Sequence, residues 1–321
     1  MGKKQYSIAF SLLVGSSLTA HVRDLNDHWS VSAEGVYMGR THYSADKGLV
    51  DNSIGEHTLM DTKDLMHEMH FKPGYRLGLE YHLSQKMSIE GNYLYLAPQS
   101  GSKKIKGDQD LNYPFKDLST VVDYHNADRV HACYGDRFWD SEANFWWHST
   151  PRFVDYFSLS VIGGLRYFNY NEKLKDKFIN GAQSSDYLVQ TKNKMGAVQL
   201  GLNFQINPMR YMNWEFTAKG GVTADYATAR TLIRDNNNTE VLRDFKNKTV
   251  QGGFFTDCMG SLGFSFLKHW NVYGGYQFIY FTGFASAEEQ LYSRVLEKRK
   301  SIDSHAKMLI QGGFVGLTAS F

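Results

Sequence analysis

Residues 195–226 read MGAVQLGLNFQINPMRYMNWEFTAKGGVTADY, and apolar side chains recur in them at every second position. In the first half, one face carries Val198, Leu200, Leu202 and Phe204. After a break at residues 206–210, the pattern resumes with Met212, Trp214, Phe216, Ala218, Val222, Ala224 and Tyr226. A period of two is the pattern of a β-strand. The stretch therefore predicts a hairpin of two long strands.

The opposite face of this hairpin is polar and includes Gln199, Asn203, Glu215, Lys219 and Asp225. Both strands exceed the usual length of roughly five or six residues. A soluble β-sandwich buries its apolar faces between two sheets, whereas a membrane barrel turns them toward lipid and keeps charged side chains inside. The remainder of the chain distinguishes between these two folds.

Composition excludes a bundle of membrane helices. Of the 321 residues, 42% are hydrophobic, the mean hydropathy is -0.43, and no run after residue 20 is apolar and long enough to cross a bilayer as a helix. Aromatic residues make up 15%, and Gly is abundant at 29 while Pro is scarce at 5. This composition favours long twisted strands with aromatic girdles.

Residues 1–20, MGKKQYSIAFSLLVGSSLTA, begin with a basic pair, continue through an apolar run at residues 8–14 and end in small residues. This is the organisation of a secretory signal peptide, so we expect the chain to be exported. Cleavage after Ala20 would remove two of 35 basic residues and leave 33 against 33 acidic ones. A neutral chain implies no nucleic-acid partner. Its two cysteines, Cys133 and Cys258, predict no disulfide framework.

Alternating patterns predict ten strands in all. They cover residues 28–40, 71–83, 87–97, 142–149, 157–170, 195–205, 212–226, 251–266, 269–282 and 308–321. The connections between them are long and short in turn. The long ones are polar and are expected to be irregular loops, as at residues 98–140, 171–192 and 228–248.

This alternation of long and short connections is specific to outer-membrane barrels. In outer-membrane barrels the short turns face the periplasm and the long loops face outward, whereas a soluble sandwich does not sort its loops by length. We therefore predict one all-β domain at residues 21–321, an antiparallel transmembrane β-barrel of about ten strands, with twelve as the alternative. Its last strand departs from the simple pattern, because Gln311 falls on the lipid-facing side and Phe314 on the interior side.

Four motifs carry a family resemblance. They are Gly275 to Ala285 (GYQFIYFTGFA) followed by Glu289-Gln290-Leu291, Asn193 to Gly201, Gly164 to Phe168, and Gly312 to Leu317 before Phe321. In these the chain resembles the Legionella-type pore-forming outer-membrane β-barrel family, also found in planctomycetes and chlamydia-like bacteria. The resemblance covers mainly the part from residue 140 onward. It implies a barrel with porin-like activity and no catalytic residues.

The polar faces of the strands predict a charged interior of both signs. The candidate pore-lining residues are Glu34, Arg76, Glu80, Glu90, Glu142, Arg166, Glu215, Lys219 and Asp257. Ten strands leave little lumen compared with porins of roughly 16 to 18 strands. Because isolated charges are costly at low dielectric, these groups either pair into an internal plug or line a narrow polar channel. The sequence leaves both open.

Aromatic residues near strand ends are candidates for interfacial girdles. They are Trp29, Tyr81, Trp147, Tyr167, Trp214 and Trp270. Phe321 ends the chain on a strand, as the signal read by the barrel-assembly machinery does. Expected partners are outer-membrane lipid and lipopolysaccharide, and Lys103, Lys104 and Lys106 are expected to form a cluster that faces either solvent or lipopolysaccharide.

Metal and enzyme functions have weaker support. His67-Glu68-Met69-His70 lacks the spacing of a zinc helix, and no metal or cofactor is expected. A rim-located hydrolase could draw on His148 with Asp140, or on Asp155 with Ser158, but no spacing defines a triad.

The chain is therefore expected in the outer membrane of a Gram-negative bacterium. The primary hypothesis is passive, porin-like passage of small polar solutes or ions through a non-enzymatic barrel. The alternatives are a closed structural or adhesion barrel at the cell surface and, with less support, a rim hydrolase.

Overall fold

The computed structural model describes residues 28–42, 46–52, 57–67, 69, 71–114, 124–149, 156–209, 211–235, 237–291 and 301–321. The expected signal peptide, residues 1–20, lies outside this part of the chain. No helix among the described residues is long and apolar enough to cross a membrane.

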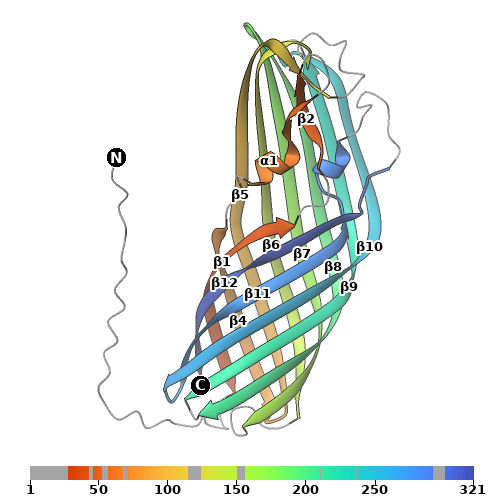
Figure 1. Cartoon of the computed structure of the whole chain (residues 1–321). Coiled ribbons are helices and arrows are strands. Elements are labelled where there is room, and N and C mark those ends of the chain that lie inside the picture. The colour runs from red at the N-terminus through yellow and green to blue at the C-terminus, as the bar shows by residue number, and fades with distance from the viewer. Residues whose placement is uncertain are drawn as a thin grey trace, which may run out of the picture.

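Ten antiparallel strands close into a ring (Figure 1). They are β1 (Trp29–His42), β4 (Lys72–Ser84), β5 (Met87–Asn112), β6 (Ala127–His148), β7 (Phe157–Asn180), β8 (Gln183–Met209), β9 (Met212–Asp235), β10 (Glu240–Leu267), β11 (Trp270–Phe284) and β12 (Ala306–Ser320). Sequential strands pair with one another, and β1 pairs with β12 from Ser30 opposite Ser320 to His42 opposite Leu309. This confirms the predicted antiparallel barrel.

A further hairpin brings the sheet to twelve strands. It consists of β2 (Gly48–Asn52) and β3 (Thr58–Asp61), and it joins the ring only at its upper end, where Asp51 lies opposite Asn112. The ring itself therefore has the ten strands that the alternating patterns predict.

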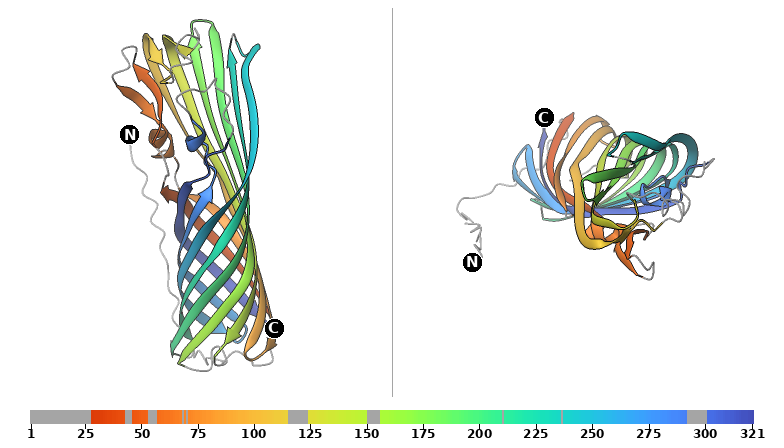
Figure 2. Two further views of the ribbon diagram at one scale, coloured as in Figure 1. Left: turned by 90° about the vertical axis from the view of Figure 1, so that its right-hand side faces the viewer. Right: turned by 90° about the horizontal axis from the view of Figure 1, so that it is seen from above.

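Three stretches that the sequence predicts as loops are largely strand. Residues 171–192 continue β7 and β8 up to a tight turn at residues 181–182, and residues 228–248 likewise extend β9 and β10. Of residues 98–140, only 113–126 lie between β5 and β6. As Figure 2 shows, these strands rise well above the rim formed by β1, β11 and β12.

The cause of this error is an inversion of polarity along each strand. In the lower half of β7, Leu159, Val161 and Leu165 point outward. In its upper half, Lys173 and Lys175 occupy the same outward face, while Leu174 and Phe178 are fully buried inside. Outside a membrane the outer face meets water and the inner face becomes a core, so the expected apolar face changes sides.

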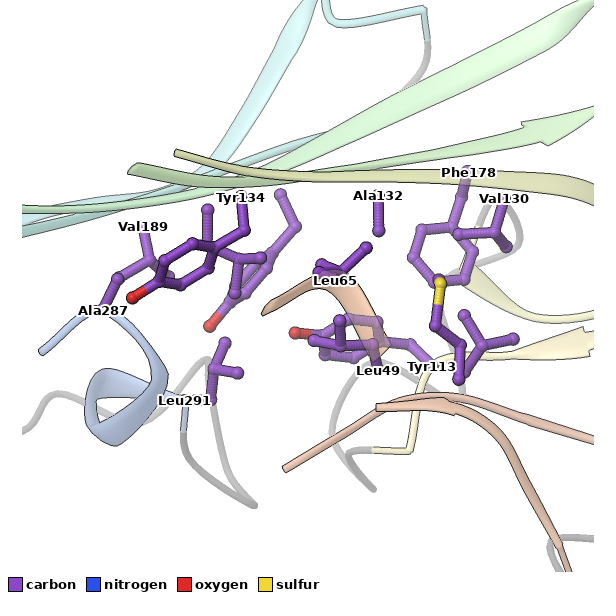
Figure 3. Close-up of a cluster of buried hydrophobic side chains, with 14 of the residues drawn as sticks. Leu49, Leu65, Tyr113, Val130, Ala132, Tyr134, Phe178, Val189, Ala287 and Leu291 are labelled. Atoms are coloured by element: carbon purple, nitrogen blue, oxygen red, sulfur yellow. The ribbon is translucent and has the colours of Figure 1, made fainter. Parts of the chain in front are cut away.

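The barrel interior is filled in layers. One apolar cluster lies at mid-height and includes Phe138, Phe168, Phe255 and Phe281. A second lies at the tall end and is shown in Figure 3. There Leu65 of α1 (Thr62–His67) and Leu291, just after η2 (Glu288–Gln290), pack toward the inner faces of the extended strands.

The chain leaves β11 through a position that requires glycine. Gly283 has φ of 75°, and a Cβ there would lie 2.6 Å from the carbonyl oxygen of Gly252. This conformation turns residues 285–291 into the mouth of the barrel, where the side chain of Asn193 bonds both the N–H and the carbonyl of Ala285 at 2.9 Å. In β12, Phe314 points inward and Gln311 bonds Thr41, as the sequence pattern placed them.

Candidate functional site in the barrel interior

The structure brings all nine candidate pore-lining residues to one place. Each lines a cavity of about 150 Å³ in the half of the barrel near the short turns. Period-two alternation accounts for this grouping, because residues of the same parity on a barrel strand face the same side. Whether the cavity belongs to a pore depends on what lies around and above it.

Arg166 of β7 anchors the first group of ion pairs. Its Nη2 lies 2.7 Å from Asp140 Oδ2 on β6, and its Nη1 lies 2.6 Å from Asp257 Oδ2 on β10. The guanidinium also lies over the ring of Phe168, 4.6 Å from the centroid. Arg166 is 4% exposed, so the contact joins three strands through a buried charge.

Arg76 of β4 continues this network across the lumen. Its Nη1 lies 2.6 Å from Glu34 Oε2 on β1, and its Nη2 donates to Gln277 of β11. Gln277 in turn donates to Asp257 at 2.8 Å. The chain Glu34–Arg76–Gln277–Asp257–Arg166–Asp140 therefore draws its members from six strands on different sides of the barrel.

The remaining interior charges are also bonded. Lys219 Nζ lies 2.8 Å from Glu142 Oε1, Glu90 accepts from Trp146 at 2.9 Å, and Glu80 accepts from Ser88 at 2.6 Å. Glu215 accepts from the side chain of Asn203 at 2.6 Å. The cavity lining contains seven carboxylates and three cations when Asp140 is included, which makes it acidic.

An aromatic layer lies directly above the ion pairs. Phe168 contacts Phe281 with ring centroids 4.7 Å apart and Phe255 at 5.1 Å, and Phe138 contacts Phe281 at 5.8 Å. All four rings are buried, the least so being Phe138 at 3% exposed. Sequence analysis missed this layer, although Phe168 shares the parity of Arg166 and Phe255 that of Asp257.

A second buried arginine lies above the aromatic layer. Arg40 Nη1 lies 2.5 Å from Glu172 Oε1 and its Nη2 lies 3.2 Å from Glu288 Oε1. The hydroxyls of Tyr134 and Tyr170 accept from the same Nη1 at 3.1 and 3.0 Å. Arg40 thus ties β1 to β7 and to the segment around η2.

Asp136 lies beside this group, three residues above the outward-facing Trp139 and hence outside the membrane-spanning part. Its Oδ2 accepts from the hydroxyl of Tyr170 at 3.1 Å. Burial raises the pKa of Asp136 from 3.8 to about 7, although Arg40 acts in the opposite direction. The folded state therefore holds this proton at a pH where the unfolded chain has released it.

A pH dependence of stability follows. The contribution of Asp136 is fully present below its unfolded pKa and is lost as the pH rises toward 7. Between pH 4 and pH 8 the free energy of unfolding should fall by on the order of 1–4 kcal/mol more for the wild type than for Asp136→Asn. In detergent micelles, the thermal midpoint of the wild type should therefore fall more steeply over this pH range. Parallel curves for the two proteins would contradict this assignment.

The candidate girdle residues lie on the outer face at two heights. Five are at the rim of short turns, namely Trp29, Tyr81, Trp147, Trp214 and Trp270, and all five are at strand ends. Tyr167 belongs to a second arc higher up, in which its ring lies 5.4 Å from Trp139. Between the two arcs most of the exposed side chains are apolar, including Leu165, Leu200 and Val222, with Thr256 as a polar exception.

The other predicted residues have separate positions. Phe321 pairs with Trp29 through two backbone bonds of 2.9 Å and is exposed, and its role in assembly stays a prediction. The three lysines do not form one cluster. Lys103 lies 2.9 Å from Asp64 of α1, whereas Lys104 and Lys106 are exposed on the outer face of β5.

Of the two hydrolase pairs, the structure describes both members of only His148 with Asp140, and these two side chains are not brought together. His148 bonds Ser160 at 2.7 Å, while Asp140 is eight residues away on the same strand and bonds Arg166. Asp155 lies outside the described residues, and Ser158 is buried. Of the possible metal motif, Glu68 and His70 also lie outside the described part, in which no group of three metal-binding side chains occurs. Cys133 and Cys258 are free thiols.

A closed antiparallel ring, an apolar outer belt between aromatic arcs and a polar interior define a transmembrane β-barrel of the outer-membrane class. No family model matches the chain, so membership of the Legionella-type family stays a hypothesis. No curated protein matches it either.

Solved structures of outer-membrane proteins are similar in fold. The outer membrane protease OmpT from Escherichia coli is 9% identical with a TM-score of 0.47, and the alignment covers 92% of this chain and 94% of OmpT. The translocator domain of the autotransporter NalP from Neisseria meningitidis is 12% identical with a TM-score of 0.40, covering 94% and 91%. The toluene transporter TodX from Pseudomonas putida is 8% identical with a TM-score of 0.25, covering 95% and 93%. These proteins differ in activity, and none of their activities is assigned to this chain.

Proposed function

We propose that this protein is a closed outer-membrane barrel that anchors its tall strand extension at the cell surface. It is a structural or adhesive barrel, and not a diffusion pore for small solutes. The observation that carries the proposal is the succession of filled layers inside the ring. From the short turns upward these are the ion-pair network, the aromatic layer and the Arg40 group.

The aromatic layer is the main barrier. An ion that passes it has to give up water among Phe138, Phe168, Phe255 and Phe281, none of which offers a hydrogen-bonding group. Dehydrating an ion without replacement ligands is costly, and hydrophobic constrictions close channels by excluding water. The charged cavity below this layer is therefore a dead end reached from the side of the short turns.

The proposed orientation follows the rule for outer-membrane barrels. Short turns and both chain ends lie on the periplasmic side in this class, and long connections lie outside. Here Trp29 and Phe321 pair at the rim of short turns, at the bottom of the view in Figure 1. This orientation presents the extended parts of β5 to β10 to the cell exterior.

Single-channel recording in a planar bilayer tests the proposal. We expect the refolded wild type, checked by heat-modifiable gel mobility, to give no discrete conductance steps. Phe168→Ala combined with Phe281→Ala removes two touching rings and should produce salt-dependent steps that favour cations, because the lining below is acidic.

Phe178→Ala is the matched control. Phe178 is also fully buried, but it belongs to the upper cluster, so its truncation leaves the layer at mid-height intact. Discrete steps from the wild type would overturn the closed barrel and restore porin-like passage as the function.

A further inference from the structure

The outer face of β7 to β10 carries a cluster of cations just above the apolar belt. We call it the basic band, and its members are Lys173, Lys192, Lys194, Arg230, Lys246 and Lys248. Strand register places them in adjacent rows. In one row, Lys192 and Lys248 lie on either side of Thr228. In the next row up, Arg230 lies between Lys246 and Gln190, and Gln190 lies opposite Lys173.

The band is continuous with the membrane-facing surface. Lys194 and Val250 both lie opposite Tyr226, and the ammonium of Lys248 lies 5.9 Å from the centroid of the Tyr226 ring. Four residues down the strand, Val222 is 69% exposed. Tyrosine with a lysine beside it above exposed aliphatic side chains is the arrangement expected where lipid headgroups meet acyl chains.

The same surface is hollowed. One groove of about 300 Å³ is lined by Lys192, Lys194, Lys246, Lys248, Arg230 and Tyr226, among others. A second groove of about 570 Å³ adjoins it, shares Gln190 and Lys192, and includes Lys173. Cationic side chains therefore surround the first groove, whereas the lining of the second also includes the carboxylates of Asp136 and Glu172.

The positive charge of the band is largely uncompensated. Arg230 pairs with Asp244 through two contacts of 2.8 Å. The five lysines have no ion-pair partner among the residues that the structure describes. Repulsion among so many close cations disfavours the bare surface, and an anion in the grooves would relieve it.

We infer that the basic band binds the phosphate groups of an anionic lipid in the leaflet at the tall end of the barrel. Lysine ammonium groups suit phosphate as compact point charges, and the apolar belt below accommodates the acyl chains of the same molecule. This continuity with the belt favours a lipid over a soluble anion. The inference goes beyond the closed barrel and holds whether or not the lumen conducts.

Lipid titration of the refolded chain in detergent, followed by native mass spectrometry, tests the inference. The probes are lipopolysaccharide with phosphorylated lipid A, the same lipid after dephosphorylation, and inorganic phosphate. The test variant combines Lys192→Gln, Lys194→Gln, Lys246→Gln and Lys248→Gln. The control combines Lys63→Gln, Lys86→Gln, Lys268→Gln and Lys307→Gln, which removes the same charge from exposed lysines outside the band.

We expect the wild type and the control to bind the phosphorylated lipid at least about tenfold more tightly than the dephosphorylated one, with weaker binding at high salt. The test variant should lose this preference while keeping its heat-modifiable mobility. Equal binding by the wild type and the test variant overturns the inference, as does equal binding of the two lipids by the wild type. Full competition by equimolar inorganic phosphate would reassign the band to a free anion and overturn the lipid assignment.

Discussion

Arg166→Met should lower the free energy of unfolding by about 3–5 kcal/mol, because it leaves buried Asp140 without its ion-pair partner and buried Asp257 with only Lys219, at 3.9 Å. Asp140 and Asp257 lie 2.7 and 2.6 Å from the guanidinium and are both about 1% exposed. Methionine preserves much of the apolar contact with Phe168, so the loss reports chiefly on charge. Urea unfolding in phospholipid vesicles, followed by tryptophan fluorescence, measures it.

Two further variants make this result decisive. Arg230→Met breaks an exposed pair with Asp244 and should cost less than about 1 kcal/mol. Adding Asp140→Asn to Arg166→Met should recover part of the loss, because it removes one of the stranded charges. A cost for Arg166→Met as small as that for Arg230→Met would show that the network does not hold the barrel together.

Arg40→Met is expected to release the segment that folds into the barrel mouth. Arg40 pairs with Glu288 of η2 and with Glu172, and Glu172 Oε2 also accepts the backbone N–H of Ala287 at 2.6 Å. Without the cation, the buried carboxylates of Glu172 and Glu288 lose the ion pairs that Arg40 supplies. Amide hydrogen exchange at residues 285–291 should become on the order of 100-fold faster, while the strands below stay protected.

Lys103→Gln is the comparison for this experiment. Lys103 also holds an appended segment, through a contact of 2.9 Å with Asp64 of α1, but this pair is more than a third exposed. Loss of this contact in Lys103→Gln should change amide hydrogen exchange in α1 by less than about fivefold. Unchanged exchange at residues 285–291 in Arg40→Met would mean that packing alone secures the segment.

The two functional proposals concern different surfaces of one wall. Inside, charged side chains are bonded across the lumen, whereas outside, the five lysines of the basic band form no ion pair within the described structure. Arg166 and Lys192 illustrate the difference. The charge of Arg166 is neutralised by carboxylates of the same chain, whereas Lys192 is one of the cations that we assign to lipid phosphate.

Within the membrane, the alternation of apolar and polar residues allowed the strands and the faces of their side chains to be predicted from the sequence alone. Lipid and interior impose opposite polarity on the two sides of a strand, so the period-two pattern is enough to assign Leu200 and Gln199 to their faces. The same rule placed Arg76, Arg166 and Asp257 inside. Strand number followed from counting the alternating segments, and the alternating lengths of the connections favoured a membrane barrel over a soluble sandwich.

Only the tertiary structure decided which interior groups meet. Partners such as Arg76 and Gln277 are 201 residues apart in the sequence, and their contact depends on how the ring closes and staggers. The upper parts of β7 to β10 were predicted as loops because water replaces lipid outside the membrane. There the outward face is polar and the apolar face points inward, so the strand sequence resembles a polar loop. The aromatic layer above Arg166 was missed for a related reason. Parity shows that Phe168 points inward, but only the closed ring shows that Phe255 and Phe281 come from other strands to meet it.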